Sequence, residues 1–102
     1  MNRKEFLKTE IEQNPSDPLN YYMLALEYRK EGQKKISGDL FDFLIEKNPQ
    51  YLPTYYTYGS YLIELGEESK AELILRSGLS FAEKAGQAKM AREIQSLLEL
   101  YY

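Results

Sequence analysis

The chain repeats itself with a period of 34 residues, and this repeat limits its fold more than any other feature. Shifting the 102-residue sequence by 34 positions places Pro15 on Pro49 and Gly32 on Gly66 without a gap. The shift also aligns Tyr21-Tyr22 with Tyr55-Tyr56, Phe6-Leu7 with Leu40-Phe41, Ile11-Glu12 with Ile45-Glu46, and Asn14 with Asn48. One register for glycine, proline and aromatic pairs indicates a structural unit that occurs more than once.

Helix signals follow the same register. Asp17 and Pro18 have the pattern of an N-cap followed by proline in the first helical position. Apolar residues then recur with the spacing of one helix face, at Tyr21, Leu24, Ala25 and Tyr28. Gly32 and, one period later, Gly66 stand where a left-handed residue ends a helix. We therefore predict about six helices, over residues 2–13, 18–31, 35–47, 53–65, 68–84 and 87–100.

The remaining segments are short loops, and no segment alternates polar and apolar residues with a period of two. Short loops are typical of packed antiparallel helix pairs, and the absence of alternation argues against strands. A chain of this length suits one domain. The sequence thus predicts a single all-α domain without a sheet.

The composition removes several kinds of catalytic and metal site. The sequence contains neither cysteine nor histidine, which excludes disulfides, thiolate metal sites and the Ser-His and Cys-His forms of nucleophilic catalysis. Paired acidic residues fall on expected polar faces or in first helical turns, where the helix dipole accounts for them. We predict a non-enzymatic protein with no catalytic residues, no cofactor and no metal.

Charge and hydropathy restrict the partners. The formal net charge is −3, so the chain lacks the positive field that drives nucleic-acid binding. No apolar run approaches the roughly 18 residues that a membrane-spanning helix needs, and no signal peptide is visible. We expect a soluble cytoplasmic protein that binds neither nucleic acid nor membrane. The basic residues Arg29, Lys30, Lys34 and Lys35 are expected to form a solvated helix end that complements the helix dipole.

At this point the sequence resembles the tetratricopeptide repeat (TPR) family, whose 34-residue pattern combines aromatic, small and proline positions. One full repeat supplies Tyr21, Leu24, Ala25, Tyr28, Gly32, Ser37, Phe41 and Pro49. The next supplies Tyr55, Tyr58, Gly59, Leu62, Gly66, Ala71 and Leu75. The resemblance implies an α-solenoid of antiparallel helix pairs, in which small residues let helices approach closely and aromatic residues fill the space between pairs.

The resemblance also divides the chain into parts. We expect an N-terminal half-repeat at 1–14, full repeats at 18–51 and 52–85, and a C-terminal capping helix at 87–102. Leu44 and Gly78 depart from the family's usual alanine, and Glu83 replaces the closing proline, so that helix is expected to continue to about Lys84. Tyr101 is expected to complete the apolar stripe of the last helix, and Tyr102 to fray or to contact a neighbouring subunit.

In this family the first helix of each repeat lines a concave groove that takes an extended or helical segment of a partner. The corresponding residues are Tyr22, Leu26, Arg29, Tyr56, Ser60 and Ile63. Some family members clamp the C-terminal carboxylate of a chaperone with lysines, asparagines and an arginine. Here Tyr22, Leu26 and Thr57 occupy those positions, so that ligand is rejected.

The resemblance therefore implies a protein–protein interaction module that binds a peptide or a helix of a partner in a short groove. Two alternatives stay open. The first is a structural homo-oligomer, such as a homodimer, that uses the same aromatic face for self-association. The second is that the terminal helices fold over this face and make it part of the core.

Overall fold

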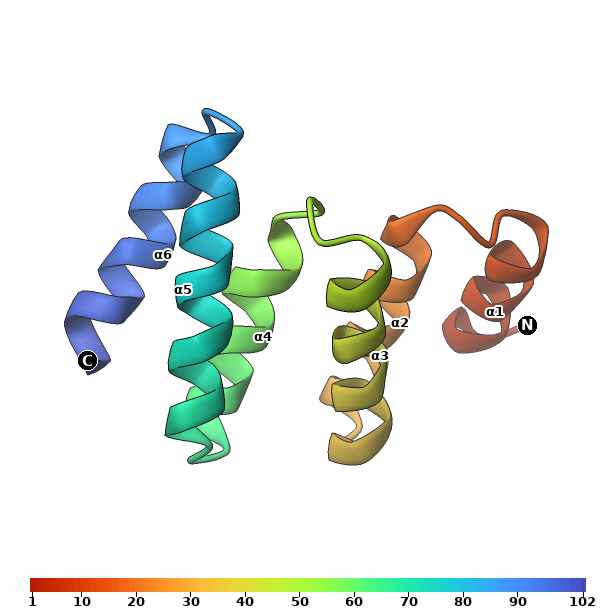
Figure 1. Cartoon of the computed structure of the whole chain (residues 1–102). Helices are drawn as coiled ribbons and strands as arrows, with labels where there is room; N and C mark the ends of the chain where they lie inside the picture. Colours follow the sequence, from red (N-terminus) through yellow and green to blue (C-terminus); the bar gives the residue numbers. More distant parts are fainter. The chain divides into compact units, whose positions relative to one another are not determined.

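Six α-helices and no strand make up the computed structural model, which describes all residues, 1–102 (Figure 1). They are α1 (Arg3–Gln13), α2 (Pro18–Lys30), α3 (Lys34–Lys47), α4 (Pro53–Glu64), α5 (Glu68–Lys84) and α6 (Ala88–Tyr101). The predicted all-α fold is confirmed, and each helix begins and ends within one residue of its predicted limits. None of the six combines the length and apolar character that a membrane crossing requires.

The helices group into two compact units, Met1–Asn48 and Pro49–Tyr102. In the first unit, α2 packs against both α1 and α3. In the second, α5 packs against both α4 and α6, and α4 also contacts α6. Each unit therefore contains one hairpin of a full repeat and one further helix that covers it.

Three glycine turns join α2 to α3, α4 to α5 and α5 to α6. Gly32, Gly66 and Gly86 have φ values of 74°, 78° and 69°. In each turn the residue after the glycine donates its N–H back across the turn: Gln33 to the Tyr28 carbonyl, Glu67 to Leu62 and Gln87 to Ala82, each at 2.9 Å. This is the Schellman arrangement. It favours glycine at the left-handed position, because a residue without a Cβ atom adopts a positive φ without steric strain. The turn into α6 thus has the geometry of the two turns within the repeats.

A tyrosine hydroxyl secures the turn that precedes each repeat. Tyr21 donates to the carbonyl of Pro15 at 2.9 Å, and Tyr55 donates to the carbonyl of Pro49. Both pairs are six residues apart, so the repeated proline and the repeated tyrosine act together. The repeat pattern alone does not predict this bond.

The core of the first unit lies between α2 and α3. Leu24 and Ala25 of α2 are buried, as are Phe41 and Leu44 of α3. From α1 only Leu7 is buried, with 3% of its surface exposed. The predicted α2 stripe therefore packs as expected at Leu24 and Ala25.

In the second unit α4 and α5 approach more closely than most helix pairs. A Cβ atom added to Gly78 would lie 2.3 Å from the Cβ of Tyr55, and one added to Gly59 would lie 2.4 Å from a methyl group of Leu75. The sequence analysis treated Gly78 only as a departure from alanine. The structure supplies the reason for it, because no side chain fits between α5 and Tyr55.

The end of α6 differs from expectation. Tyr101 is 54% exposed, so the prediction that it completes the apolar stripe is wrong; the buried residues of α6 are Ile94 and Leu98. Tyr102 does not fray, because its hydroxyl donates to the Glu68 carbonyl at 2.9 Å. This bond ties the end of α6 to the beginning of α5.

Candidate protein-binding faces

On α2 the three predicted site residues form one continuous face. Tyr22, Leu26 and Arg29 follow the i, i+4, i+7 spacing that stacks side chains along one side of a helix. All three are partly exposed. The Tyr22 ring packs edge-on against buried Phe41, with centroids 6.4 Å apart and an interplanar angle of 71°. This contact places the Tyr22 ring at the edge of the core, with part of its surface exposed.

On α4 the same spacing recurs. Tyr56, Ser60 and Ile63 are also partly exposed, although much of α4 is buried, including Tyr55 and Leu62. The part-exposed face therefore occupies the same repeat position in each unit. The partial exposure of this face on α4 does not result from poor packing, because most of the other residues of α4 are buried.

The two faces offer similar chemistry. Each begins with a tyrosine and contains one aliphatic residue, Leu26 on α2 and Ile63 on α4. Each also contains a group that forms hydrogen bonds, the Arg29 guanidinium and the Ser60 hydroxyl. Rigid aromatic side chains with adjacent aliphatic and polar groups are typical of the residues that dominate protein interfaces.

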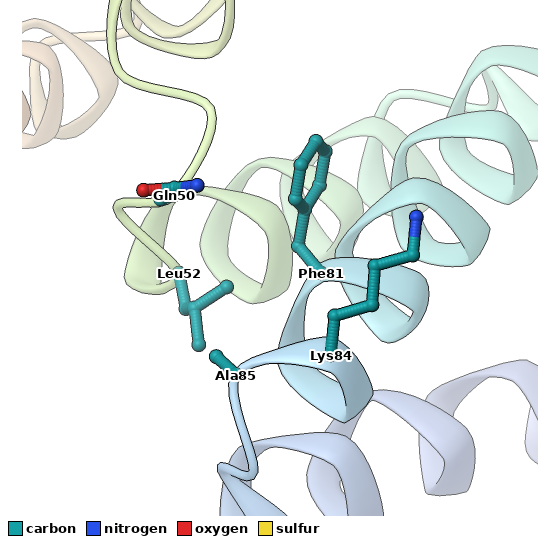
Figure 2. A pocket seen from close by; sticks show the side chains of 5 residues that line it. All are labelled: Gln50, Leu52, Phe81, Lys84 and Ala85. Atoms are coloured by element: carbon teal, nitrogen blue, oxygen red, sulfur yellow. The ribbon is translucent and has the colours of Figure 1, made fainter.

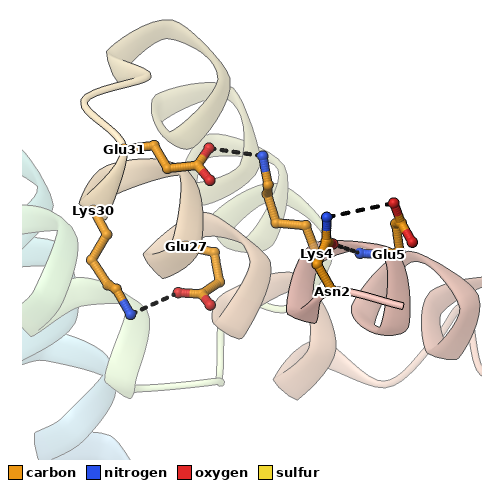
Figure 3. Close-up of polar contacts among 6 residues, drawn as sticks. All are labelled: Asn2, Lys4, Glu5, Glu27, Lys30 and Glu31. Carbon is orange, nitrogen blue, oxygen red and sulfur yellow. Dashed lines mark hydrogen bonds and ion pairs between the residues drawn. The ribbon is translucent and has the colours of Figure 1, made fainter.

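Two lysines of the basic cluster have nearby carboxylates. Lys30 Nζ lies 3.2 Å from Glu27 Oε2 (Figure 3) and Lys35 Nζ lies 3.3 Å from Asp39 Oδ2. Both lysines are exposed. Two of the four basic residues of the cluster therefore have a carboxylate partner within the chain.

A separate pocket of 390 Å³ lies in the second unit, lined by Gln50, Leu52, Phe81, Lys84 and Ala85 (Figure 2). Gln50 and Leu52 come from the segment before α4, and the other three come from the end of α5. None of the predicted site residues lines it. Sequence reasoning missed this pocket because its two walls are about one full repeat apart along the chain.

The pocket borders the tethered tyrosine of the second repeat. The Phe81 ring stacks on Tyr55, with centroids 5.8 Å apart and an interplanar angle of 27°. Burial raises the pKa of the Tyr55 phenol above its ordinary value. The phenol therefore keeps the proton that it donates to the Pro49 carbonyl to a higher pH than an ordinary tyrosine does.

No group of three acidic, cysteine or histidine side chains gathers where it could hold a metal ion. The candidate faces consist of aromatic, aliphatic, hydroxyl and guanidinium groups, which are found at protein interfaces.

Helix hairpins closed by glycine turns and repeated in a 34-residue register define the chain as an α-helical repeat protein. A tetratricopeptide repeat domain protein from Salinibacter ruber, solved in solution, matches it with a TM-score of 0.78 and 31% identity, over 82% of this chain and 85% of the other. A crystal structure of the Salinibacter ruber domain matches with a TM-score of 0.72 and 31% identity, over 79% and 90%. This chain belongs to the tetratricopeptide repeat family.

A third solved structure, of a Bordetella parapertussis protein, supports the fold alone. Its TM-score is 0.81 at 21% identity, over 99% of this chain and 88% of the other. No family model matches the chain, and no curated protein matches it.

Proposed function

We propose that this protein is a non-enzymatic interaction module that binds a peptide or a helix of a partner protein through the exposed faces of α2 and α4. The residues that contact the partner are Tyr22, Leu26, Arg29, Tyr56, Ser60 and Ile63. One observation carries the proposal: both repeats leave the same i, i+4, i+7 face of their first helix partly exposed, each headed by a tyrosine.

The contacts of α1 support an accessible face on α2. The described side-chain contacts between α1 and α2 involve Met23, Glu27, Tyr28 and Glu31. These residues lie on a different side of α2 from Tyr22, Leu26 and Arg29. A protein partner also fits the net charge of −3 better than a nucleic acid does.

The test replaces the two tyrosines by alanine. A partner is first captured from native lysate and purified, and its affinity for the wild-type chain is then measured. Each Tyr22→Ala or Tyr56→Ala change is expected to cost about 2 kcal/mol of binding free energy, roughly a 30-fold loss of affinity for a hot-spot residue. The control is Leu73→Ala with Tyr101→Ala, since both residues are exposed and lie outside the proposed faces.

Two results count against the proposal. If the double tyrosine variant binds the partner normally, the faces are wrongly assigned. If it loses helicity by circular dichroism, the tyrosines belong to the core. Light scattering at micromolar concentration distinguishes the alternative of a homodimer. A dimer that the same double change converts to a monomer would show that the faces serve self-association.

A further inference from the structure

Several of the contacts that attach helix α1 to α2 involve charged side chains. Leu7 is the only buried residue of α1. Arg3 Nε lies 3.2 Å from Glu27 Oε1, and Lys4 Nζ lies 2.8 Å from Glu31 Oε1. Figure 3 shows the second of these pairs, with Lys4 reaching across from α1 to the end of α2. The hydrogen bond from Lys4 to Glu31 raises the pKa of the lysine.

The ring of Tyr28 receives the other cationic contacts. Lys4 Nζ lies 4.9 Å and Lys8 Nζ 5.8 Å from its centroid. In addition, an Arg3 guanidinium nitrogen lies 4.0 Å from the sulfur of Met23. The α2 residues under these cations are Met23, Glu27, Tyr28 and Glu31, and we call them the acidic strip.

These contacts are weak compared with the packing between α2 and α3. The Lys4–Glu31 pair and the cation–π contacts lie near the surface, where each contributes little and salt screens them further, whereas the Glu27 side chain that pairs with Arg3 is only 14% exposed. A single buried leucine adds only a modest apolar area. The α2–α3 hairpin instead buries Leu24, Ala25, Phe41 and Leu44. Release of α1 therefore leaves the core of this hairpin in place.

The turn between α1 and α2 allows such a release. Asn14, Pro15, Ser16 and Asp17 are all exposed. The bond from Tyr21 to the Pro15 carbonyl keeps the second half of this turn on α2. A change of backbone angles near Asn14, which would break the 3.2 Å bond from the Asp17 N–H to the Asn14 carbonyl, would separate α1 from α2.

We propose that the acidic strip is a docking site for a cationic amphipathic helix of a partner protein, and that α1 is a built-in competitor for it. Charge complementarity identifies the occupant. Two carboxylates flank an aromatic face, and one of them, Glu27, also pairs with Lys30 of α2 at 3.2 Å. Helix α1 presents Arg3, Lys4 and Lys8 to this face, with Leu7 between them. A partner helix with cations and a leucine at the same spacing makes the same contacts and displaces α1.

The site shares no residue with the faces proposed above. Binding to the acidic strip and binding through Tyr22 and Tyr56 therefore succeed or fail independently. In particular, Tyr22→Ala should leave binding at the acidic strip unchanged.

The experiment uses a synthetic peptide with the sequence of residues 1–14, labelled with a fluorophore, as the stand-in for the partner helix. The receptor is the full chain carrying Arg3→Glu and Lys4→Glu, which turns attraction to Glu27 and Glu31 into repulsion and frees the strip. Fluorescence anisotropy should show about tenfold tighter peptide binding than to the wild type, because the competitor no longer occupies the site. Added salt should weaken this binding.

Two matched controls define the site. A peptide of the same length with its arginine and lysines replaced by glutamate should not bind. The charge-reversed receptor with Glu27→Gln and Glu31→Gln added should lose binding of the original peptide. Amide hydrogen exchange on each receptor reports whether α2 and α3 stay protected while α1 does not. If the charge reversal disturbs α2 or α3, Leu7→Ala releases α1 without new charge and takes its place.

Three outcomes overturn the proposal. The first is a receptor with unprotected α1 amides that binds the peptide no better than the wild type. The second is protection of α1 that persists in both receptor variants, which would show that neither the charges nor Leu7 holds it. The third is a wild-type dimer that Glu27→Gln abolishes, because the strip would then take α1 of a second copy and not a separate partner.

Discussion

The close approach of α4 and α5 at Gly78 makes a quantitative prediction. An alanine Cβ there would lie 2.3 Å from Tyr55 Cβ and 2.7 Å from Cγ, whereas carbon atoms ordinarily approach to about 3.5–4.0 Å. Tyr55 cannot move aside easily, because it is buried, stacked on Phe81 and bonded to the Pro49 carbonyl. The two helices must separate instead.

Overpacking of a well-filled core costs about 1–3 kcal/mol. Since the clash involves an atom next to the backbone, we take the upper end of that range. Alanine regains about 1 kcal/mol over glycine through its helix propensity. The expected net loss for Gly78→Ala is therefore about 2 kcal/mol of unfolding free energy, measured by urea denaturation followed by far-ultraviolet circular dichroism.

The control is Ser80→Ala, a change at an exposed position of the same helix. It alters propensity without a clash and should stay within about 0.5 kcal/mol of the wild type. The reasoning is refuted if Gly78→Ala is as stable as the wild type or more stable, because propensity alone would then account for the result.

Three further changes test other parts of the structure. Tyr55→Phe removes the bond to the Pro49 carbonyl and should cost about 1 kcal/mol at neutral pH. Burial raises the Tyr55 pKa, so the unfolded chain loses this proton at a lower pH than the folded chain does. The wild type should therefore lose stability as the pH rises above 10.0, the ordinary pKa of tyrosine. Urea titrations should show a smaller loss in Tyr55→Phe. Gly66→Ala, at a φ of 78° with nothing within 4 Å, should cost about 1–2 kcal/mol from backbone strain alone, and equal stability in urea would contradict this. Ile94→Ala in α6 should cost about 3 kcal/mol by thermal and urea unfolding, whereas Leu100→Ala, 72% exposed, should change little; equal effects would mean that α6 does not pack as described.

The sequence was enough to predict the helices because their limits depend on local chemistry. Asp17 accepts from the N–H of Leu19 at 3.0 Å as an N-cap, and Gly32 and Gly66 adopt the left-handed conformation that their positions indicated. Both features are decided by a few neighbouring residues. The 34-residue register then shows the glycine turn twice, which separates the pattern from chance.

Contacts between side chains distant in sequence could not be predicted in the same way. The apolar spacing of α2 places the Tyr21 ring on the core side, but it does not indicate which group accepts a hydrogen bond from the hydroxyl. Likewise, the pattern identified Gly78 as unusual without indicating how close Tyr55 would come. The contacts of Arg3, Lys4 and Lys8 with α2 depend on which charged side chains of the two helices lie opposite each other. The apolar pattern of a single helix does not predict this.

The predicted binding faces are predictable in part: their position follows from the sequence, but their partner does not. Their position on α2 and α4 follows from helical spacing, and Tyr22 and Tyr56 are indeed neither buried nor fully exposed. Their partner depends on surface complementarity, which a single sequence does not encode. The faces therefore remain a proposal that the tyrosine variants decide.

The pattern of helix packing has a consequence for how the chain is made. The packing that defines each unit joins helices adjacent in sequence, α1 with α2 and α2 with α3 in the first unit, and α4 with α5 and α5 with α6 in the second. Closing such short loops is inexpensive, so helical proteins of this kind fold quickly. During translation the hairpin of α2 and α3 can form as soon as it leaves the ribosome, before α4 has emerged, and little apolar surface waits exposed for a distant partner.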